Sequence, residues 1–313
     1  TFNTALGGQA LVTNSTGGSN TGLGYNALYS NTTANNNTAV GYQAGYNITT
    51  STGNTALGYQ SAYTLSSVGT GDYTTSVGYQ ALFYGTGDQN VAVGRQSQYG
   101  ASGTTTGSFN TSLGTQALYS NTTASYNTAV GYQAAYSQTT GGYNDAFGAS
   151  ALYATTTGTS NTAIGRLSLT SNTTGAANVA LGTQALQANT TASNNTAVGY
   201  QAGYTNSTGQ SFAMLGYQAG YSNTADWTVA IGRQALYTNS SGTFNTALGG
   251  QALVTNSTGG SNTGLGYNAL YSNTTASYNT AVGWSAMYSN TTGQNTAYGA
   301  GALYTNSTGT ANT

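Results

Sequence analysis

A glycine that follows Ala-Leu, Ala-Val or a similar pair recurs at nearly constant spacing along all 313 residues, and it constrains the fold more than any other feature. We take this glycine as the anchor of a repeat and count positions from it, so that −1 precedes the anchor and +3 is the third residue after it. The spacing is 17 residues, apart from three steps of 16 and two of 20. A fixed period of this length is typical of a solenoid of stacked units. The eighteen anchors are Gly7, Gly24, Gly41, Gly58, Gly78, Gly94, Gly114, Gly131, Gly148, Gly165, Gly182, Gly199, Gly216, Gly232, Gly249, Gly266, Gly283 and Gly299.

The unit is too short for two packed helices, and its composition favours β-structure. Thr, Val and Tyr favour strands, whereas Asn, Ser and Gly favour turns. We therefore predict an all-β fold, a parallel β-solenoid (β-roll) of about eighteen 17-residue coils, each with two short strands joined by turns. Stacked coils pair their backbone groups with both neighbours and share one core. We expect residues 1–313 to be a single continuous repeat array and a segment of a longer fibre. Residues 1–34 recur unchanged as 243–276, which indicates an internal duplication.

The tolerance of each position predicts which side chains face inward. Position −1 is apolar in all eighteen units and position +3 is always Ala or Ser, so both are predicted to face a narrow interior. Position +4 is usually Leu but also holds Gly45 and Gln98, and position +5 is usually Tyr. Both are predicted to face outward or toward an interface. The anchor glycine is predicted to make a bend with positive φ, in preference to a close approach of a second backbone.

Side chains that carry chemistry are nearly absent. The chain has three Arg and four Asp, and no Lys, Glu, His, Cys or Pro. Catalysis and metal binding need clustered His, carboxylates or thiolates, so we predict no enzymatic activity, no cofactor and no metal site. Arg95, Arg166 and Arg233 are too far apart to form a phosphate-binding patch, so no nucleic-acid partner is expected. No apolar run reaches the length needed to cross a membrane.

The few charges follow the repeat. Asp88 precedes Arg95 by seven residues, and Asp226 precedes Arg233 by the same seven. This spacing predicts two copies of one local ion pair. If exposed, each pair contributes little to stability.

The octet Asn-Thr-Ala-Val-Gly-Tyr-Gln-Ala, at 37–44, 127–134 and 195–202, resembles the head repeats of YadA-type trimeric autotransporter adhesins. Units of that family read approximately Asn-Ser-Val-Ala-Ile-Gly, two variable residues, then Ser or Ala. The resemblance covers essentially the whole chain, although the family unit is shorter and this chain carries a longer Tyr-Ser-Asn-Thr-Thr-Gly loop. It implies a left-handed β-roll, three chains side by side and adhesion at a cell surface. Similar repeats occur in phage-like tail-fibre proteins.

We predict a structural or adhesive fibre segment, extracellular or at the cell surface, that self-associates as a homotrimer. Surface glycans or a host receptor are the candidate partners. The alternatives are an ice-binding or glycan-binding β-solenoid and a phage tail-fibre shaft. Ice binding favours a flat face with regularly spaced Thr, whereas most Thr here lie with Asn and Gly in the turn segment. The 16- and 20-residue steps are also expected to break the register of such a face.

Two rows of side chains are candidate sites. Asn followed by two Ser or Thr residues recurs at position +7; each is a formal glycosylation acceptor, or else these residues form turns by bonding nearby backbone groups. The acceptors are Asn14, Asn31, Asn121, Asn172, Asn189, Asn206, Asn239, Asn256, Asn273, Asn290 and Asn306. The Tyr residues at position +5 form either a carbohydrate-stacking surface or, as we favour, an interface between chains. They include Tyr29, Tyr119, Tyr136, Tyr153, Tyr204, Tyr237 and Tyr271.

Overall fold

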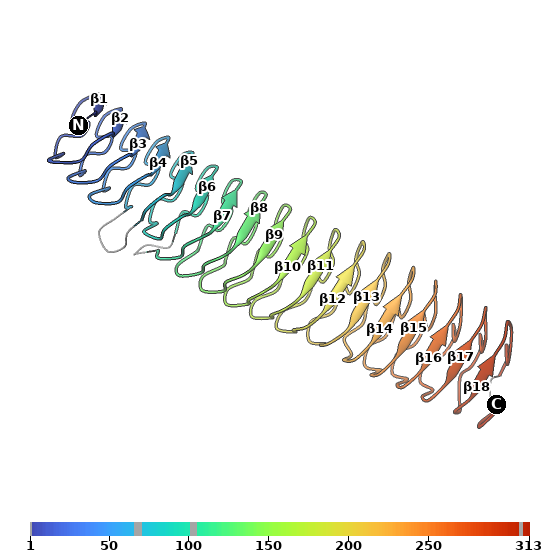
Figure 1. Cartoon of the computed structure of the whole chain (residues 1–313). Helices are drawn as coiled ribbons and strands as arrows, with labels where there is room; N and C mark the ends of the chain where they lie inside the picture. The colour runs from blue at the N-terminus through green and yellow to red at the C-terminus, as the bar shows by residue number, and fades with distance from the viewer. Residues whose placement is uncertain (1, 66–70, 101–104, 307–308) are drawn as a thin grey trace. The chain divides into compact units, whose positions relative to one another are not determined.

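The computed structural model describes residues 2–65, 71–100, 105–306 and 309–313 (Figure 1). The chain divides into two compact units, Thr1–Ser160 and Asn161–Thr313. Each unit contains nine coils of the repeat, and each coil contributes one three-residue strand. The described residues contain no helix. The predicted all-β parallel β-solenoid with coils of about 17 residues is therefore confirmed, while its handedness and the trimer stay predictions.

The strands lie side by side on one face of each unit (Figure 1). The strands of the first unit are β1 (Thr4–Leu6), β2 (Thr21–Leu23), β3 (Thr38–Val40), β4 (Thr55–Leu57), β5 (Thr75–Val77), β6 (Val91–Val93), β7 (Thr111–Leu113), β8 (Thr128–Val130) and β9 (Asp145–Phe147). Those of the second unit are β10 (Thr162–Ile164), β11 (Val179–Leu181), β12 (Thr196–Val198), β13 (Ala213–Leu215), β14 (Val229–Ile231), β15 (Thr246–Leu248), β16 (Thr263–Leu265), β17 (Thr280–Val282) and β18 (Thr296–Tyr298).

Within each unit, successive strands pair in parallel, position for position. Thr38 is opposite Thr55 after a 17-residue step, and Val91 is opposite Thr111 after a 20-residue step. The 16-residue step to Val91 likewise keeps it opposite Thr75. The 16- and 20-residue steps are therefore accommodated outside the strands. The prediction that they break the register is wrong.

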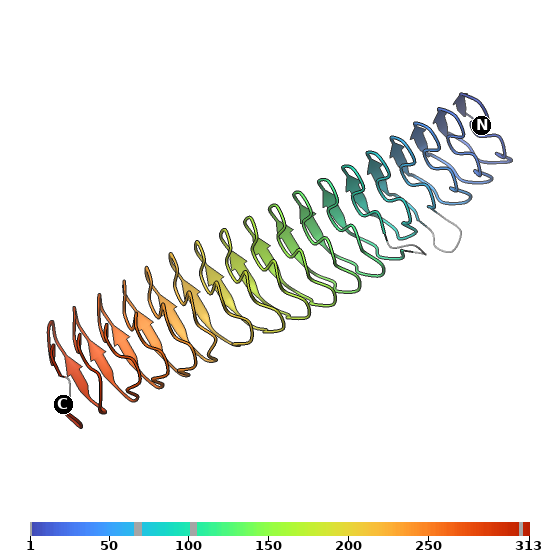
Figure 2. The same cartoon turned by 180° about the vertical axis from the view of Figure 1, so that it is seen from behind.

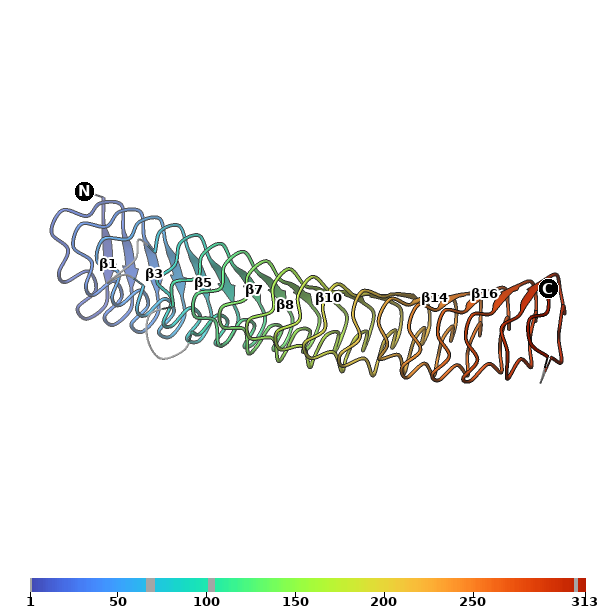
Figure 3. The same ribbon diagram turned by 90° about the horizontal axis from the view of Figure 1, so that it is seen from below.

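Turns and bends make up nearly all of the rest of each coil, so the prediction of two strands per coil is wrong. In the described residues, the pairing outside the named strands is one isolated bridge between Gly85 and Thr105. Figures 2 and 3 show the turn segments stacked coil upon coil behind and below the strands of each unit. Their backbone groups still bond between coils, as when Leu118 N donates to Ala134 O at 3.0 Å.

The core is formed by positions −2, +3 and +4. In the internal coils the middle residue of each strand, as in Ala39 and Ala129, is buried, and so are the +3 alanines and the +4 leucines such as Leu118. The prediction for +3 is confirmed, but the outward placement of +4 is wrong. Where +4 is Gly203, Met214 and Phe212 of the next coil fill the space, at 3.4 and 3.6 Å from the point that a Cβ on this glycine would occupy.

Position −1 faces outward, against the prediction. All eighteen −1 residues are exposed or half-buried, and the exposed fraction is 48% for Leu113 and 43% for Leu181. The physical reason is strand alternation: positions −3 and −1 share one face of the sheet and −2 occupies the other. Because the small −2 residue packs against the inward +4 leucine, the apolar −1 residue must lie on the outer face.

The anchor glycines satisfy both of the roles considered for them. Their φ values run from 123° to 141°, a region that other residues rarely adopt. A Cβ on Gly24 would also lie 2.5 Å from Gly41 O of the next coil. The backbones of successive coils therefore approach too closely at this point for any side chain.

Candidate functional surfaces

The described residues form no pocket, and they contain no cluster of three or more His, Cys, Asp or Glu that could hold a metal ion. No helix long and apolar enough to span a bilayer occurs among them. The candidate sites are therefore surfaces, built from rows of side chains that repeat from coil to coil.

The Asn residues at position +7 lie inside the coil. All of the glycosylation candidates are buried except Asn14 and Asn306, which are half-buried. Asn256 Nδ2 donates to Asn239 Oδ1 of the preceding coil and to Gly259 O of its own turn, both at 2.8 Å. A glycan on such a nitrogen would displace these bonds from the interior. The turn interpretation is thus the one that the hydrogen bonds support.

A second Asn row, at position −4, was not singled out from the sequence. Asn occurs at this position in fifteen of the eighteen units. Asn127 N donates to Asn110 Oδ1 at 3.0 Å, while Asn110 Nδ2 donates to Ala124 O at 2.9 Å. Each side chain thereby joins its own coil to the next. The signal was available, because this Asn opens the recurring octet.

The +5 aromatic residues form stacks inside each unit. In the first unit, neighbouring ring centroids are 4.9–5.3 Å apart. The eight rings are Tyr29, Tyr46, Tyr63, Phe83, Tyr99, Tyr119, Tyr136 and Tyr153. The second unit has two stacks of three: Tyr204, Tyr221 and Tyr237, then Tyr271, Tyr288 and Tyr304.

Every Tyr proposed from the sequence as interchain surface belongs to one of these stacks and is half-buried within its own chain. Because adjacent rings cover one another's faces, the interior rings present only their edges to solvent. Stacking of a sugar requires an open ring face. The +5 row is therefore poorly suited to that role.

Burial raises the pKa of the Tyr136 hydroxyl, and the neighbouring Tyr119 and Tyr153 raise it further. The pKa values of Tyr63, Tyr99, Tyr221 and Tyr288 are raised in the same way, with desolvation as the largest cause. These hydroxyls stay protonated near neutral pH, so they add no charge to the stacks.

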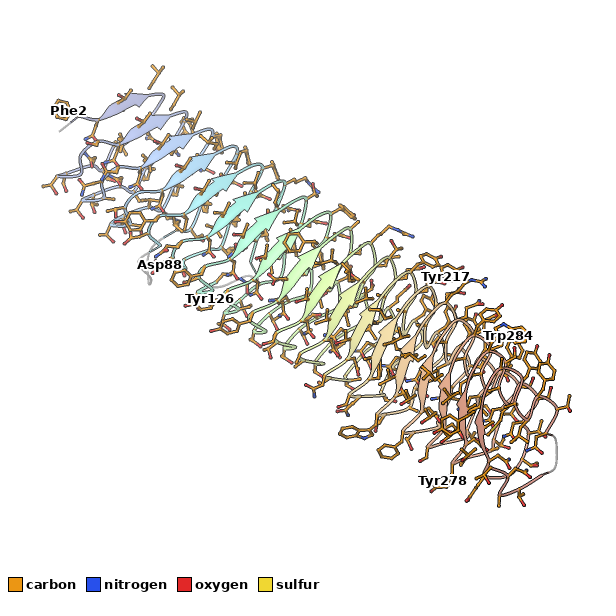
Figure 4. All side chains as sticks on the ribbon, turned by 45° about the vertical axis from the view of Figure 1, so that its right-hand side comes forward. Phe2, Asp88, Tyr126, Tyr217, Tyr278 and Trp284 are labelled. Atoms are coloured by element: carbon orange, nitrogen blue, oxygen red, sulfur yellow. The ribbon has the colours of Figure 1, made fainter. Side chains whose placement is uncertain are left out.

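Two further aromatic rows are exposed. The +1 row follows the anchor and contains Tyr25, Tyr42, Tyr59, Tyr79, Tyr132, Tyr200, Tyr217, Tyr267 and Trp284. The −5 row precedes the strand and contains Phe2, Tyr73, Phe109, Tyr126, Tyr143, Trp227, Phe244 and Tyr278. In the second unit, Tyr217 and Trp284 project from one edge of the strands and Tyr278 from the opposite edge (Figure 4).

Between these two edges lies the outer face of the sheet. It consists of position −3, which is Thr in thirteen of the eighteen strands, and of the apolar −1 residues. The alternation is visible in β7, where Ser112 is buried while Thr111 and Leu113 are exposed. This outer sheet face, bordered by the +1 and −5 rows, is a candidate surface to which every coil of each unit contributes.

In comparisons with protein-family models, with curated proteins and with solved structures, no match to this chain is found. The resemblance to YadA-type head repeats thus stays a prediction, and the functional interpretation rests on the fold and its surfaces.

Proposed function

We propose that this chain is a structural, non-catalytic segment of an extracellular fibre and that it self-associates laterally, as a homotrimer, through the outer sheet face. The fold is consistent with a structural repeat protein. The observation that carries the proposal is the exposure of apolar −1 residues on the outer sheet face of each unit and of aromatic +1 residues along one edge of that face.

The size of this face favours a protein partner. An exposed Leu or Tyr that is about half accessible presents roughly 70–100 Å², so nine coils with one or two such residues present on the order of 1,000 Å² per unit. Monomeric soluble proteins rarely expose apolar patches above a few hundred Å². A specific interface needs about 800 Å² from each partner. Burying this face between copies supplies that area.

The surface proposed here differs from the one favoured by the sequence. The +4 leucines are inside the coil and the +5 tyrosines already stack within the chain, so neither row needs a partner chain. The adhesive role, with surface glycans or a host receptor as partner, rests on the family resemblance and on the fibre architecture. The tail-fibre shaft shares this architecture and would use the same lateral surface.

The test compares the two surfaces in the full chain by sedimentation velocity and mass photometry. Replacing Leu113, Leu181 and Leu215 on the outer face by Ser is expected to dissociate the oligomer. The matched control replaces Tyr119, Tyr136 and Tyr237 of the +5 row by Ser and is expected to leave the oligomer intact. Wild-type protein that stays monomeric at its highest soluble concentration would refute the proposal.

Ice binding is the second candidate, because the structure places the Thr residues of position −3 in a regular row on the outer sheet face. Thr38 and Thr55, for example, are opposite one another in successive strands. The same face, however, carries −1 residues of unequal bulk, from Val40 to Phe147. A thermal-hysteresis measurement separates the two functions, since a face covered by another chain cannot contact ice.

A further inference from the structure

The charged side chains lie on the two edges of the outer sheet face. All three Arg are at position +1, and three of the four Asp, namely Asp72, Asp88 and Asp226, are at position −6. In the second unit, Arg233 directly follows the anchor after β14, and Asp226 lies before β14. In the first unit, Arg95 and Asp88 flank β6 in the same way. Each unit thus has one coil with an acid at one edge and an arginine at the other.

Within one chain, Asp226 and Arg233 do not form the predicted local ion pair. The strand alone spans about 10 Å between the two edges. Asp226 Oδ1 accepts a hydrogen bond from Gln210 N of the preceding coil at 2.7 Å, and the described residues show no ion pair between Asp226 and Arg233. The expectation of a local pair at this coil is wrong.

The arginines are available to a partner. Arg95 and Arg233 are exposed, whereas Asp88 and Asp226 are half-buried at the opposite edge. A carboxylate can accept about four hydrogen bonds, so the bond from Gln210 leaves capacity at Asp226. Trp227, beside Asp226, is 58% exposed. This edge therefore offers a guanidinium both a carboxylate and an aromatic ring.

We propose that copies of this chain pack in parallel and in axial register, with the +1 edge of one copy against the −6 and −5 edge of the next. Arg233 then pairs with Asp226 of the neighbouring copy, and Arg95 pairs with Asp88 of that copy. This inference rests on the proposed self-association and specifies its orientation. The contact is heterologous, so it closes into a ring when the rotation between copies allows, as in a trimer.

The position of the charges along the repeat selects this register. The acid and the arginine belong to the same coil in both units, so copies in register bring both pairs together. A shift by one coil would place Arg233 opposite Gln210 or Thr243, which are neutral. The shift toward Gln210 would still place Arg95 opposite Asp72, so it keeps one opposite-charge pair where the in-register packing keeps two. Opposite charges at an interface fix register and discriminate against such alternatives.

Two charge-reversed full-length variants test the inference. One carries Arg95→Asp and Arg233→Asp, and the other carries Asp88→Lys and Asp226→Lys. In low salt, each variant alone is expected to self-associate about tenfold more weakly than wild type. The two variants are expected to bind each other more tightly than either binds itself, because a mixed contact again joins opposite charges. A pair within one chain would give no such preference.

Controls separate charge from loss of structure. Asp88→Asn with Asp226→Asn removes the charge and keeps the acceptor oxygen, as Asn35 Oδ1 shows by accepting from Gly18 N at 2.8 Å. This variant is expected to weaken association and to reduce its salt dependence. Arg166→Asp is the matched control, since the residue seven positions earlier is the neutral Thr159. It is expected to have no effect.

A cross-linking measurement does not depend on affinity. The chain has no cysteine, so Arg233→Cys and Asp226→Cys chains can be joined by a short bifunctional maleimide. Cross-links are expected in the mixture and not in either variant alone. If the wild type associates, but the charge-reversed variants show no preference for each other and the Cys variants form no cross-link, this packing is overturned and the self-association stands. Monomeric wild type overturns the proposed self-association and this inference with it.

Discussion

Residues 1–34 and 243–276 have the same sequence, but their side chains are buried to different extents. Val12 is 55% exposed, whereas its counterpart Val254 is 9% exposed. The middle residue of the first strand, Ala5, is exposed, while Ala247 is fully buried. The difference arises because the coil of β15 packs against the coil of β14, and no described coil precedes that of β1.

Contacts within the two copies are nearly the same. Asn31 Nδ2 donates to Asn14 Oδ1 at 2.7 Å, and Asn273 Nδ2 donates to Asn256 Oδ1 at 2.8 Å. The sequence therefore determines the shape of the coil and its bonds to the next coil. Burial of its other side is supplied by the preceding coil, as expected when stability is a sum of nearest-neighbour terms.

The largest effect is expected where a neighbouring backbone would meet a new side chain. In Gly131→Val, a Cβ would lie 2.8 Å from Gly148 O, so overpacking of about 1–3 kcal/mol adds to the cost of the strained φ, about 1–3 kcal/mol. Gly299→Val has the strained φ of 123° but nothing closer than 4.0 Å. We expect the first variant to lose roughly twice as much stability in denaturant unfolding. Equal losses would show that the neighbouring coil is not the cause.

A change at the strand centre compares the two copies directly. Ala247→Leu inserts three carbons between packed coils and is expected to cost about 1–3 kcal/mol. Ala5→Leu is expected to cost little, because Ala5 is exposed. Native-state hydrogen exchange of the two copies provides the measurement. A similar loss of protection in both variants would contradict the interpretation that the preceding coil causes the difference in burial.

At position +7, the difference in stability loss between an internal Asn and a terminal one is expected to be smaller. Asn256 donates to one neighbouring Asn and accepts from the other, so Asn256→Ala leaves buried partners unsatisfied at a cost of about 1–3 kcal/mol. Asn14 is half-buried and has an Asn partner on one side. We expect Asn14→Ala to cost less than half as much, as measured by the shift in the unfolding midpoint.

The smallest effect, a gain, is expected at position +5. Val254 separates the stack that ends at Tyr237 from the one that begins at Tyr271. Val254→Tyr can stack on both, and each aromatic pair contributes about 0.5–1.5 kcal/mol. Val12→Tyr can stack only on Tyr29. A thermal shift that is not larger for the internal variant would count against stacking as a source of stability.

The candidate surface was only partly predictable. Two apolar rows, −1 and +4, occur in the sequence, and the lower variability of −1 predicts that this row forms the core. The structure reverses them: Leu118 is buried and Leu113 is exposed. Variation at +4 is tolerated inside because larger residues of the next coil, such as Met214, fill the space left by Gly203. Position −1 is apolar in every unit, although its side chains differ in bulk, and it lies on the outer face, which is consistent with one repeating partner surface.

The repeat, the coil length, the β-solenoid and the need for glycine at the anchor can all be derived from the sequence alone. These follow from period and local propensity, which do not depend on what surrounds a coil. The three-dimensional packing of the coils was needed to show which apolar row is inside, why Asn at +7 and −4 can be buried, and which edges carry the charges. Those outcomes depend on strand alternation and on hydrogen bonds between residues about 17 positions apart, such as Asn256 and Asn239. Whether a side chain faces the interior or the solvent is therefore determined only when the next coil packs against its own coil.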